Sequence, residues 1–386
     1  METRISRLGG KAVNLVELQD AGFPVPPFVV LDTAEYFTFV SDTGVSPIIT
    51  RAMQLPAAQA AEAIRAAFRR PMPEGQRARI SSTIAPLLDR PVAVRSSATA
   101  EDLPEASFAG LQDSFLDVRG LDAALAAIIE CWSSLWTERA ITYRARNQIS
   151  GDGLGLAVIV QEMVDAEAAG VMFTADPLSG HRGRIVVEAV PGLAEKLVGG
   201  LATPNIFTIE IASHKVLEQS VQGARPTLSA GQLQRLARLG QRIAAHFGQP
   251  QDIEWTLADD RLAVVQTRPV TSLYPLPEGP AEALWLSFGG FQGMLDPISP
   301  LGADVLLRAI TQAAPLFGGQ LLDHRANPYL QPAGERLWVR FDRLARGPAG
   351  RAVVKLLAAG DPAAAELLTR LAAGPESAHH PIRGRL

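Results

Sequence analysis

The chain has 386 residues, of which 36 are Lys or Arg, 40 are Asp or Glu and 47% are hydrophobic. This length predicts two or three domains, and the net charge of -4 argues against a nucleic-acid scaffold held by a general basic field. The single cysteine excludes an internal disulfide, no signal-peptide core follows Met1, and no apolar run could span a bilayer. We therefore expect a cytoplasmic protein without a membrane or nucleic-acid role.

Strands and helices alternate through the first two thirds of the chain. Apolar residues recur at a helical period from Leu121 to Ile141, which predicts one amphipathic helix. A second helix is expected to begin at Ser229, which can form a capping box with Gln232, and to end at Gly248. Short β-branched and apolar runs predict buried strands at Pro91–Arg95, Leu156–Val160, Ala169–Thr174 and Arg184–Ala189. The pattern predicts a mixed α/β fold.

A proline-rich segment predicts the domain boundary. Tyr274–Pro280 holds three prolines and one glycine in seven residues, which favours an extended linker over a helix or a central strand. We predict an α/β domain over residues 1–273 and a linker over 274–280. An incomplete, mainly helical second domain with a disordered tail is expected over 281–386.

The first candidate site lies close to the amino terminus. Gly9 and Gly10 let backbone N–H groups approach an anion, and the adjacent Lys11 adds a compact positive charge. This combination suits a phosphate group. The alternative is a helix start that carries a surface lysine, because short strings of this kind are common.

The second candidate site follows the strand at 91–95. Arg95 stands at the strand end, Ser96 follows it, and Gly110 lies in a further stretch rich in Ser and Gly. A guanidinium followed by hydroxyl groups and a glycine suits the phosphates of a nucleotide. The alternative is a polar loop whose hydroxyl groups bond only to their own backbone.

The third candidate site is a predicted hairpin over residues 251–269. A three-residue loop at 258–260 would place Leu257 opposite Arg261 and Asp252 opposite Gln266. Directly opposed residues share a face and side chains alternate along a strand. The expected register therefore fixes which polar residues project together.

Four polar side chains would leave one side of this hairpin: Asp252, Glu254, Gln266 and Arg268. Glu254 would lie diagonal to Gln266, at roughly 7 to 8 Å. Because Mg²⁺ binds one or two protein oxygen ligands together with phosphate oxygens, the set could clamp a magnesium nucleotide. A solvated, charged hairpin face is the alternative.

A fourth candidate is the polar end of the strand at 156–160. Gln161, Glu162 and Met163 could offer backbone donors and acceptors to a purine at a strand edge, with the methionine packed on the ring. Core packing is the alternative interpretation.

The ordered motifs resemble the nucleotide-binding region of the phosphoenolpyruvate synthase and pyruvate phosphate dikinase family. They run from residue 5 to about residue 271 and comprise GGKAVNLVELQDAGFPVPPFVV, VAVRSSATAEDLPEASFAGLQDSFLDV, VIVQEMV, AGVMFTADPLSG, GLAEKLVGG, DIEWTL and VVQTRPV. A further segment, Trp285 to Gly302, resembles the start of the second domain in the rifampin phosphotransferase branch.

The resemblance implies an ATP-grasp-like fold and ATP and Mg²⁺ as ligands. It implies that Lys11 and Arg95 hold the triphosphate, Glu254 and Gln266 organise Mg²⁺, and Arg268 stabilises the moving phosphoryl group. It also implies that ATP gives its β-phosphoryl group to a histidine on a mobile domain, leaving AMP and phosphate. The histidine then phosphorylates a separate substrate.

The chain departs from this family in its histidines. None of its six histidines lies in the Thr-Ser-His-Ala context that the family's carrier histidine has, and His214 falls in an expected turn. Ala194 and Lys196 also differ from the residues usual in the GLAEKLVGG segment. Because 281–386 is short for the family's second domain, we expect a fragment, a split protein or a shortened homologue.

Three functions follow as hypotheses. The first is the ATP-binding part of a dikinase-type phosphotransferase, which needs a histidine domain or chain as a partner. The second is a nucleotide-binding module without catalysis, and the third is an ATP-grasp ligase, for which no acyl-acceptor site is visible. The sequence leaves the final phosphoryl acceptor open among a rifamycin, pyruvate and other alcohols.

Overall fold

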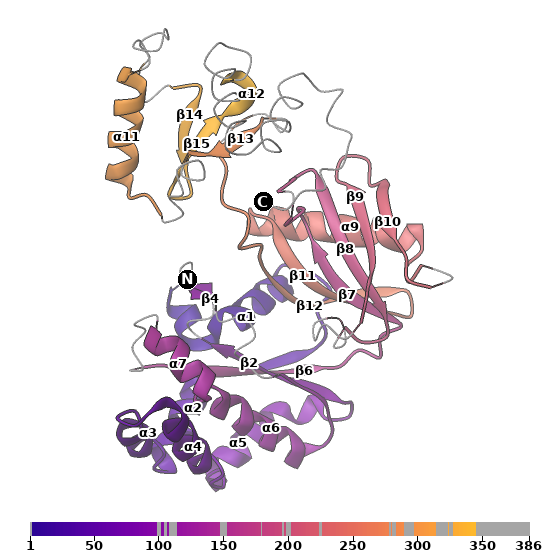
Figure 1. Cartoon of the computed structure of the whole chain (residues 1–386). Helices are drawn as coiled ribbons and strands as arrows, with labels where there is room; N and C mark the ends of the chain where they lie inside the picture. Colours follow the sequence, from indigo (N-terminus) through magenta and orange to yellow (C-terminus); the bar gives the residue numbers. More distant parts are fainter. Residues whose placement is uncertain are drawn as a thin grey trace. The chain divides into compact units, whose positions relative to one another are not determined.

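Figure 1 shows the computed structural model of the chain. The structure describes residues 2–98, 102–103, 106–107, 114–146, 153–178, 180–194, 197, 202–223, 226–277, 279, 283–288, 297–313, 323 and 327–344. The chain divides into two compact units, Met1–Thr271 and Ser272–Leu386. No helix among the described residues has both the length and the apolar character needed to cross a bilayer.

The first unit contains a four-stranded antiparallel sheet in the order β1-β6-β2-β5. Its strands are β1 (Phe28–Leu31), β2 (Val92–Ala98), β5 (Ser114–Val118) and β6 (Leu156–Glu162). A separate pair consists of β3 (Asp102–Leu103) and β4 (Ala106–Ser107). Since β6 lies between β1 and β2, both of its edges are paired.

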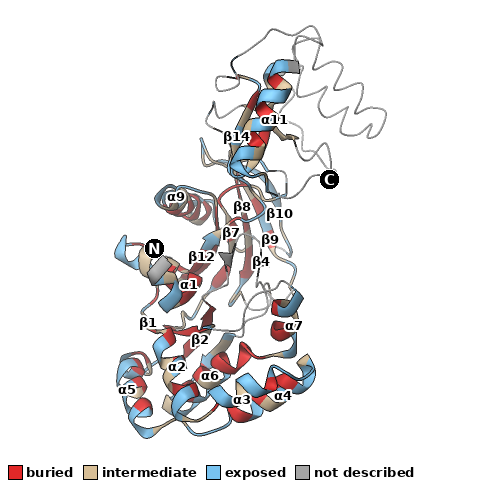
Figure 2. Ribbon diagram, turned by 90° about the vertical axis from the view of Figure 1, so that its left-hand side faces the viewer, coloured by how far each residue is buried: buried red, intermediate tan, exposed pale blue. Residues whose placement is uncertain are grey.

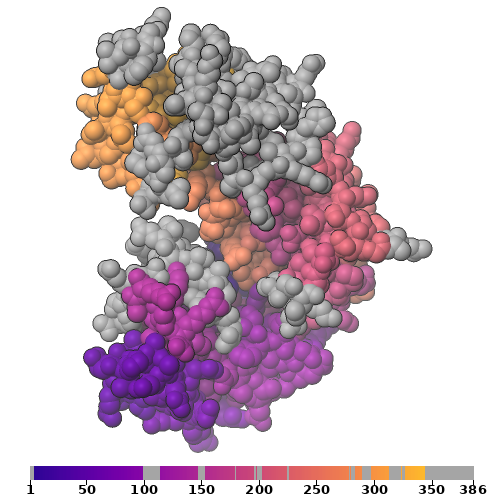
Figure 3. All heavy atoms as spheres, viewed as in Figure 1, coloured from indigo at the N-terminus to yellow at the C-terminus, as the bar shows by residue number. Residues whose placement is uncertain are grey.

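Helices cover one face of this sheet (Figure 1). They are α2 (Thr33–Asp42), α3 (Ser46–Ala52), α4 (Ala57–Ala67), α5 (Glu74–Ile84), the 3₁₀ turn η1 (Ala85–Leu87), α6 (Leu121–Ser134) and α7 (Glu138–Arg146). In Figure 3 the indigo and purple atoms of this part of the chain lie close together on the face that is shown. Figure 2 shows their inner sides as buried and their outer sides as exposed, as expected for amphipathic helices.

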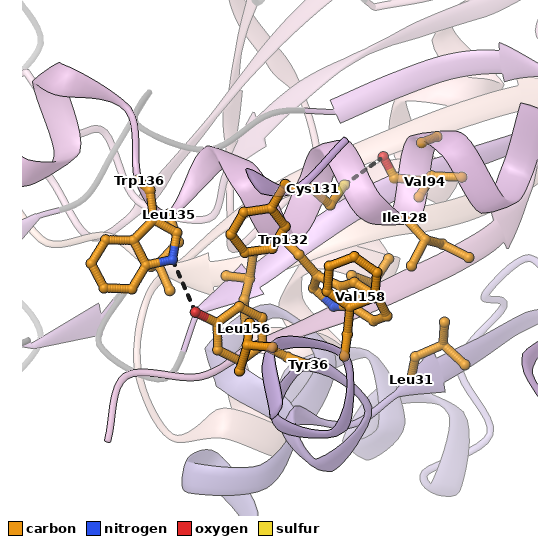
Figure 4. Close-up of a cluster of buried hydrophobic side chains, with 14 of the residues drawn as sticks. Leu31, Tyr36, Val94, Ile128, Cys131, Trp132, Leu135, Trp136, Leu156 and Val158 are labelled. Carbon is orange, nitrogen blue, oxygen red and sulfur yellow. Dashed lines mark hydrogen bonds between the residues drawn. The ribbon is translucent and has the colours of Figure 1, made fainter. Parts of the chain in front are cut away.

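An aromatic cluster fills the core between these helices and the sheet (Figure 4). Trp132 is completely buried, and the indole N–H of Trp136 donates to the hydroxyl of Tyr36 at 2.9 Å. Cys131 is also completely buried, and its Sγ lies 3.8 Å from the carbonyl oxygen of Val94 on β2. This cluster holds β2 against the helices and leaves the other face of the strand for different contacts.

The predicted helix from Leu121 to Ile141 is in fact two helices, α6 and α7. The chain turns between them, where Thr137 Oγ1 accepts from the Ala140 N–H at 3.2 Å. The buried Arg144 donates to the carbonyl oxygen of Leu135 at 2.7 Å. Apolar residues on both sides of the turn face the same core, so their periodicity hides the break.

A six-stranded antiparallel sheet forms the rest of the first unit, in the order β10-β9-β8-β7-β11-β12. Its strands are β7 (Ala168–Phe173), β8 (Arg184–Pro191), β9 (Asn205–Glu210), β10 (Val216–Ser220), β11 (Gln251–Ala258) and β12 (Arg261–Pro269). The helix α9 (Ala230–Phe247) packs on one face, where Gly240 leaves room for Met172. The four strands predicted from the sequence are confirmed as β2, β6, β7 and β8.

The predicted ends of α9 are also confirmed. Ser229 caps the helix and forms the capping box with Gln232, and Gly248 ends it in a left-handed conformation. His214 lies in the turn between β9 and β10, as predicted, with a φ of 55°. Its Nε2 lies 2.9 Å from Oε1 of Gln241 on α9.

The helix α1 (Glu2–Asp20) packs against β2 and β6 of the first sheet and against β12 of the second. Ala12 and Leu15 join Ile159 of β6 in a small buried cluster, whereas Leu18 belongs to the core under the second sheet. Asn14 Nδ2 donates to the carbonyl oxygen of Thr267 on β12 at 3.0 Å. One helix therefore contacts both sheets.

Among its described residues, the second unit has a three-stranded sheet in the order β13-β15-β14 and the helices α11 and α12. Its described elements are β13 (Trp285–Ser287), α11 (Pro300–Ala313), β14 (Leu330–Ala333), β15 (Arg336–Arg340) and α12 (Phe341–Leu344). Sequence analysis expected helices here and did not predict the sheet. Pro275, which sequence analysis assigned to the linker, packs against the β14–β15 turn at Gly334. The expected tail, including His379 and His380, lies outside the described residues.

Candidate functional site

Arg95 of β2 reaches across to the β11–β12 hairpin of the other sheet. Its Nη2 donates to Oε2 of Glu254 and to Oε1 of Gln266, each at 2.8 Å, and its Nη1 donates to the carbonyl oxygen of Val265 at 3.0 Å. The side chains of Arg95 and Glu254 are 12% and 24% exposed, so solvent screens this ion pair only partly. The three predicted residues Arg95, Glu254 and Gln266 therefore lie together.

The predicted register of the hairpin is wrong. Its turn has two residues, Asp259 and Asp260, with φ values of 48° and 57°, as in the tight turns that favour hairpins. The structure pairs Ala258 with Arg261, where sequence analysis paired Leu257 with Arg261. It also sets Asp252 opposite Arg268, whereas the prediction set it opposite Gln266. Glu254 lies directly opposite Gln266, whereas the prediction placed the two residues diagonally.

A bulge at Val265 explains why the predicted face is nevertheless correct. Trp255 pairs with Val264 and Glu254 with Gln266, so Val265 is the extra residue on β12. The bulge lets Val264 face the core under α9 while Gln266 faces the opposite way. Residues two apart normally share a face, so the two side chains could not diverge in a regular strand. The same bulge presents the Val265 carbonyl oxygen to Arg95.

A second ion pair lies beside the first on the same face. Nε of Arg268 donates to Oδ2 of Asp252 at 2.8 Å, with the aspartate side chain 11% exposed and the arginine side chain 48% exposed. Burial raises the pKa of Asp252, the charge and hydrogen bond of Arg268 oppose this shift, and the charge of Glu254 adds to it. All four residues predicted on this face of the hairpin are thus found there.

A further carboxylate, Glu188, extends this face across the six-stranded sheet. Val171 of β7 pairs with Glu254 on one side and with Glu188 of β8 on the other, so the three side chains share a face. Burial raises the pKa of Glu188, and the negative charge of Asp252 raises it further. We call Glu188, Asp252 and Glu254 the acidic face. Sequence analysis missed Glu188, because only the sheet order brings β8 near the hairpin.

The Gly9-Gly10-Lys11 segment lies inside α1, at a break in the helix. Gly9 has φ 72° and ψ 166°, a conformation open to glycine alone, and the helix resumes directly after it. Lys11 is half-buried in the first turn of the resumed helix. The segment is therefore a helix start that carries a lysine, as the alternative interpretation expects, and phosphate binding at this turn stays a prediction.

The hydroxyl residues after Arg95 divide between the two faces of β2. Ser96 is completely buried and lies on the face of Val94, toward the helical core, so its position gives no support to the predicted contact with a ligand beside Arg95. Ser97 lies on the Arg95 face instead. Ser114 of β5 is exposed and sits directly opposite Arg95 in the strand pairing. Gly110 lies outside the described residues.

The predicted purine edge is not a free edge. The backbone N–H of Glu162 donates to Pro27 and that of Met163 to Pro91, each at 2.9 Å, because this end of β6 lies between two chain segments. These N–H groups are therefore already bonded. Glu162 Oε1 also pairs with Arg90 at 2.7 Å.

Gln161 differs from its two neighbours. Its side chain lies on the Arg95 face of the sheet, 2% exposed, and its Nε2 is buried with no hydrogen-bond partner among the described residues. A buried amide donor without a partner costs free energy that a ligand acceptor could restore. Of the three residues predicted at this strand end, Gln161 has the strongest geometric support.

The donor set of the hairpin fits a magnesium ion. Oε2 of Glu254 and Oε1 of Gln266 converge on one cationic nitrogen of Arg95, each at 2.8 Å. One carboxylate and one amide oxygen suit Mg²⁺, which completes its shell with water and phosphate oxygens. No cluster of three or more His, Cys, Asp or Glu suited to a metal occurs in the part of the chain that the structure describes. These residues would thus hold Mg²⁺ together with a phosphate ligand.

Comparison with known proteins identifies the family. Residues 5–225 and 219–277 match the model described as pyruvate phosphate dikinase, AMP/ATP-binding domain. The chain belongs to this family. The match covers α1, both sheets of the first unit and α9, and so includes Arg95 and the β11–β12 hairpin.

Relatives of the family include two kinds of named protein. A rifampicin phosphotransferase of Streptomyces sviceus is 37% identical over 395 residues, covering 94% of this chain and 44% of that protein. One from Bacillus subtilis is 43% identical over 266 residues, covering 61% and 30%. A probable phosphoenolpyruvate synthase of Methanothermobacter thermautotrophicus is 39% identical over 304 residues, covering 69% and 44%. The chain spans less than half the length of each of these relatives.

Solved structures give a more distant likeness. A D-alanine-D-alanine ligase from Helicobacter pylori matches with a TM-score of 0.30 and 8% identity, over 66% of this chain and 52% of that chain. A likeness at this level carries no conclusion about chemistry. The mixed α/β fold predicted from the sequence is confirmed by the two sheets and their covering helices.

Proposed function

We propose that this chain binds MgATP as the nucleotide-binding part of a dikinase-type phosphotransferase. In that reaction a carrier histidine takes the β-phosphoryl group of ATP, water takes the γ-phosphoryl group, and AMP and phosphate leave. The observation that carries the proposal is the convergence of Glu254 and Gln266 on Arg95 within a family named for AMP and ATP binding.

The cations of the site would bind the triphosphate. Arg95 is fixed by three hydrogen bonds, and a guanidinium held in this way can present its remaining donors to phosphate oxygens in a set direction. Lys11 would add charge from the first turn of the resumed helix, where the helix dipole also favours anions. Arg268, which is half-exposed, would stabilise charge on the moving phosphoryl group.

The acids of the hairpin would organise the metal. Glu254 and Gln266 would be direct ligands, and Asp252 would orient Arg268 and add negative charge beside the ion. When bound, Mg²⁺ would neutralise phosphate charge and hold the phosphates in line for transfer. The protein's own contribution is positioning and electrostatic stabilisation, which suffice for much of phosphoryl-transfer catalysis.

The purine would bind near the end of β6. The Nε2 of Gln161, which has no hydrogen-bond partner in the part of the chain that the structure describes, can donate to a ring nitrogen, and Met163 can pack on the ring. Because the N–H groups of Glu162 and Met163 are already bonded, the backbone could contribute only carbonyl oxygens here. This restriction favours a ligand with an exocyclic amino group, as in adenine.

The carrier histidine would come from a separate domain or chain. None of the six histidines has a Thr-Ser-His-Ala context, and His214 sits in a β-turn bonded to Gln241. The relatives are more than twice as long as the part that this chain matches, which leaves room in them for such a domain. The final acceptor would be set by that partner and could be a rifamycin, as in the relatives' name, or pyruvate.

The test is transfer of label from ATP labelled at the β-phosphoryl group. The chain alone should bind MgATP but remain unlabelled, and adding a separate histidine domain with a Thr-Ser-His-Ala segment should produce an acid-labile label on that domain. Transfer should be slow, since docking is no longer intramolecular. Rapid labelling of the unaided chain would overturn the assignment of the carrier, and His214→Ala would be the first variant to examine.

A nucleotide-binding module without catalysis gives a different result in the same experiment. MgATP binding would then persist, but no histidine domain would become labelled at any concentration. A folded chain that binds no MgATP would remove both hypotheses. Glu254→Gln should suppress labelling while leaving the chain folded, since it removes one negative charge and keeps the size of the side chain.

A further inference from the structure

Ser97 stands out as a buried polar residue that joins the two cationic segments of the proposed site. It follows Arg95 by two residues on β2, so both side chains lie on the same face, about 7 Å apart along the strand. Ser97 is completely buried. Its Oγ accepts a hydrogen bond from the backbone N–H of Ala12 in α1 at 3.1 Å.

The bond from Ala12 is a helix cap supplied by a distant strand. Gly9 has non-helical dihedral angles, so it occupies the N-cap position of the helix that resumes at Gly10, and Ala12 is the third residue of that helix. An N-cap serine would accept from this same N–H group, but Gly9 has no side chain with which to do so. Ser97, 85 residues away in the sequence, takes that role.

The close approach of Ser97 requires a glycine at position 9. A Cβ atom at Gly9 would lie 2.3 Å from the carbonyl oxygen of Ser97 and 2.4 Å from its Oγ. The first atom is backbone and cannot rotate away. A capping side chain on α1 itself is therefore excluded, and the close approach of the two backbones leaves Ser97 as the cap.

We infer that Ser97 is a positioning residue for the triphosphate end of the nucleotide site, an inference that rests on the proposed MgATP binding. Lys11 lies between Gly10 and Ala12 in the turn that Ser97 holds, and Arg95 lies on the strand that supplies Ser97. The bond thus sets the distance between the two cations that would grip one polyphosphate. Orienting two charges before the ligand arrives lowers the entropy lost on binding.

A double-mutant cycle between Ser97→Ala and Lys11→Ala tests this role, with the Kd for MgATP measured by calorimetry. Ser97→Ala alone should raise the Kd roughly tenfold, the equivalent of one good hydrogen-bonded contact. In the Lys11→Ala background the same change should raise it less than about threefold, because the residue that Ser97 positions is gone. Equal effects in both backgrounds would overturn the inference.

Two further variants separate positioning from general stability. Ser134→Ala is the matched control, since it also removes a buried hydroxyl, one that donates to the Cys131 carbonyl oxygen at 2.7 Å. It should lower the melting temperature and leave the Kd unchanged. Gly9→Ala should reproduce the loss of affinity, because its Cβ pushes the turn away from Ser97.

The outcomes distinguish this inference from the function on which it rests. If the wild-type chain does not bind MgATP, the proposed function fails first. If it binds MgATP but Ser97→Ala and Gly9→Ala leave the Kd unchanged, only the inference about Ser97 is wrong. Should Ser97→Ala fail to fold, Ser97→Cys fills the same volume with a weak acceptor and serves in its place.

Discussion

The two sheets of the first unit bring opposite charges to the same site. The four-stranded sheet contributes Arg95 and, through Ser97, holds the turn that carries Lys11. The six-stranded sheet contributes the acidic face, with Glu254 and Gln266 directed at Arg95. Helices cover the apolar face of each sheet, so the two polar faces are the ones that can face each other.

The division of charge between the two sheets suggests how the site could be selective for a ligand that carries both phosphates and a metal ion. The guanidinium and its carboxylate partner are 159 residues apart in sequence, and the proposed binding of MgATP would need groups from both sheets. Cations without the acids would bind any anion, and acids without the cations would bind only a metal. Substitutions that disturb this pairing of cations and acids should have effects that decrease in the order given below.

The largest effect should come from Arg95→Lys, which keeps the charge but removes the fork of donors. One ammonium cannot reach Glu254, Gln266 and the Val265 carbonyl oxygen with the same geometry, so the Kd for MgATP should rise by roughly tenfold to a hundredfold. Calorimetry measures the change. Arg77→Lys is the control, because Arg77 forms an exposed ion pair with Asp122 at 2.6 Å, away from the candidate site. Equal affinities for Arg95→Lys and wild type would contradict the account.

A smaller effect should follow deletion of Val265. The pairings on both sides of the bulge survive the deletion, since Val264 can still face Trp255 and Gln266 can still face Glu254 in a regular ladder. The chain should therefore fold and lose mainly the carbonyl acceptor of Arg95. We expect the Kd for MgATP to rise about three- to tenfold, less than with Arg95→Lys. An unfolded product would show that the bulge is needed for the sheet itself.

The smallest effect should come from Glu188→Gln and should depend on pH. The pKa values of Asp252 and Glu188 are both raised, so the folded state favours their protonated forms. The stability gained from protonation is present below the ordinary carboxyl range and is lost as pH rises through the raised pKa values. Near neutral pH the variant should melt roughly 1 to 2 °C higher than wild type, because it relieves charge repulsion.

Thermal melting across the range from about pH 4 to about pH 8 checks this prediction. The difference between Glu188→Gln and wild type should shrink toward the acidic end, where the carboxyls become neutral. A variant that melts lower than wild type at neutral pH would show that Glu188 makes a favourable contact that outweighs the repulsion.

Local patterns in the sequence were enough for much of the fold. The strands β2, β6, β7 and β8 follow from short β-branched runs, and α9 follows from its capping box and its final glycine. These signals depend only on residues close together in the chain. The break between α6 and α7 escaped because Arg144, which binds the Leu135 carbonyl oxygen there, gives no periodic signal.

The residue types of the candidate site could be predicted from the sequence, but the strand register and the contacts between distant segments could not. The hairpin face was found from alternation, yet the register was wrong because neither the two-residue turn nor the bulge at Val265 has a clear sequence mark. Ser96 follows Arg95 directly in the sequence, but Ser97 is the serine that shares its face, because side chains alternate along β2. Glu188 and the Ser97 cap depend on contacts between distant segments, which no local pattern encodes.

The most direct test of the central claim is a calorimetric titration of ATP into the wild-type chain with and without Mg²⁺. The account predicts one site per chain, with an affinity that rises when Mg²⁺ is present, because the two sheets bind the phosphates and the metal together. In Glu254→Gln the increase due to Mg²⁺ should largely disappear. Equal affinity with and without Mg²⁺ in the wild type, or no binding to the folded chain, would contradict the claim.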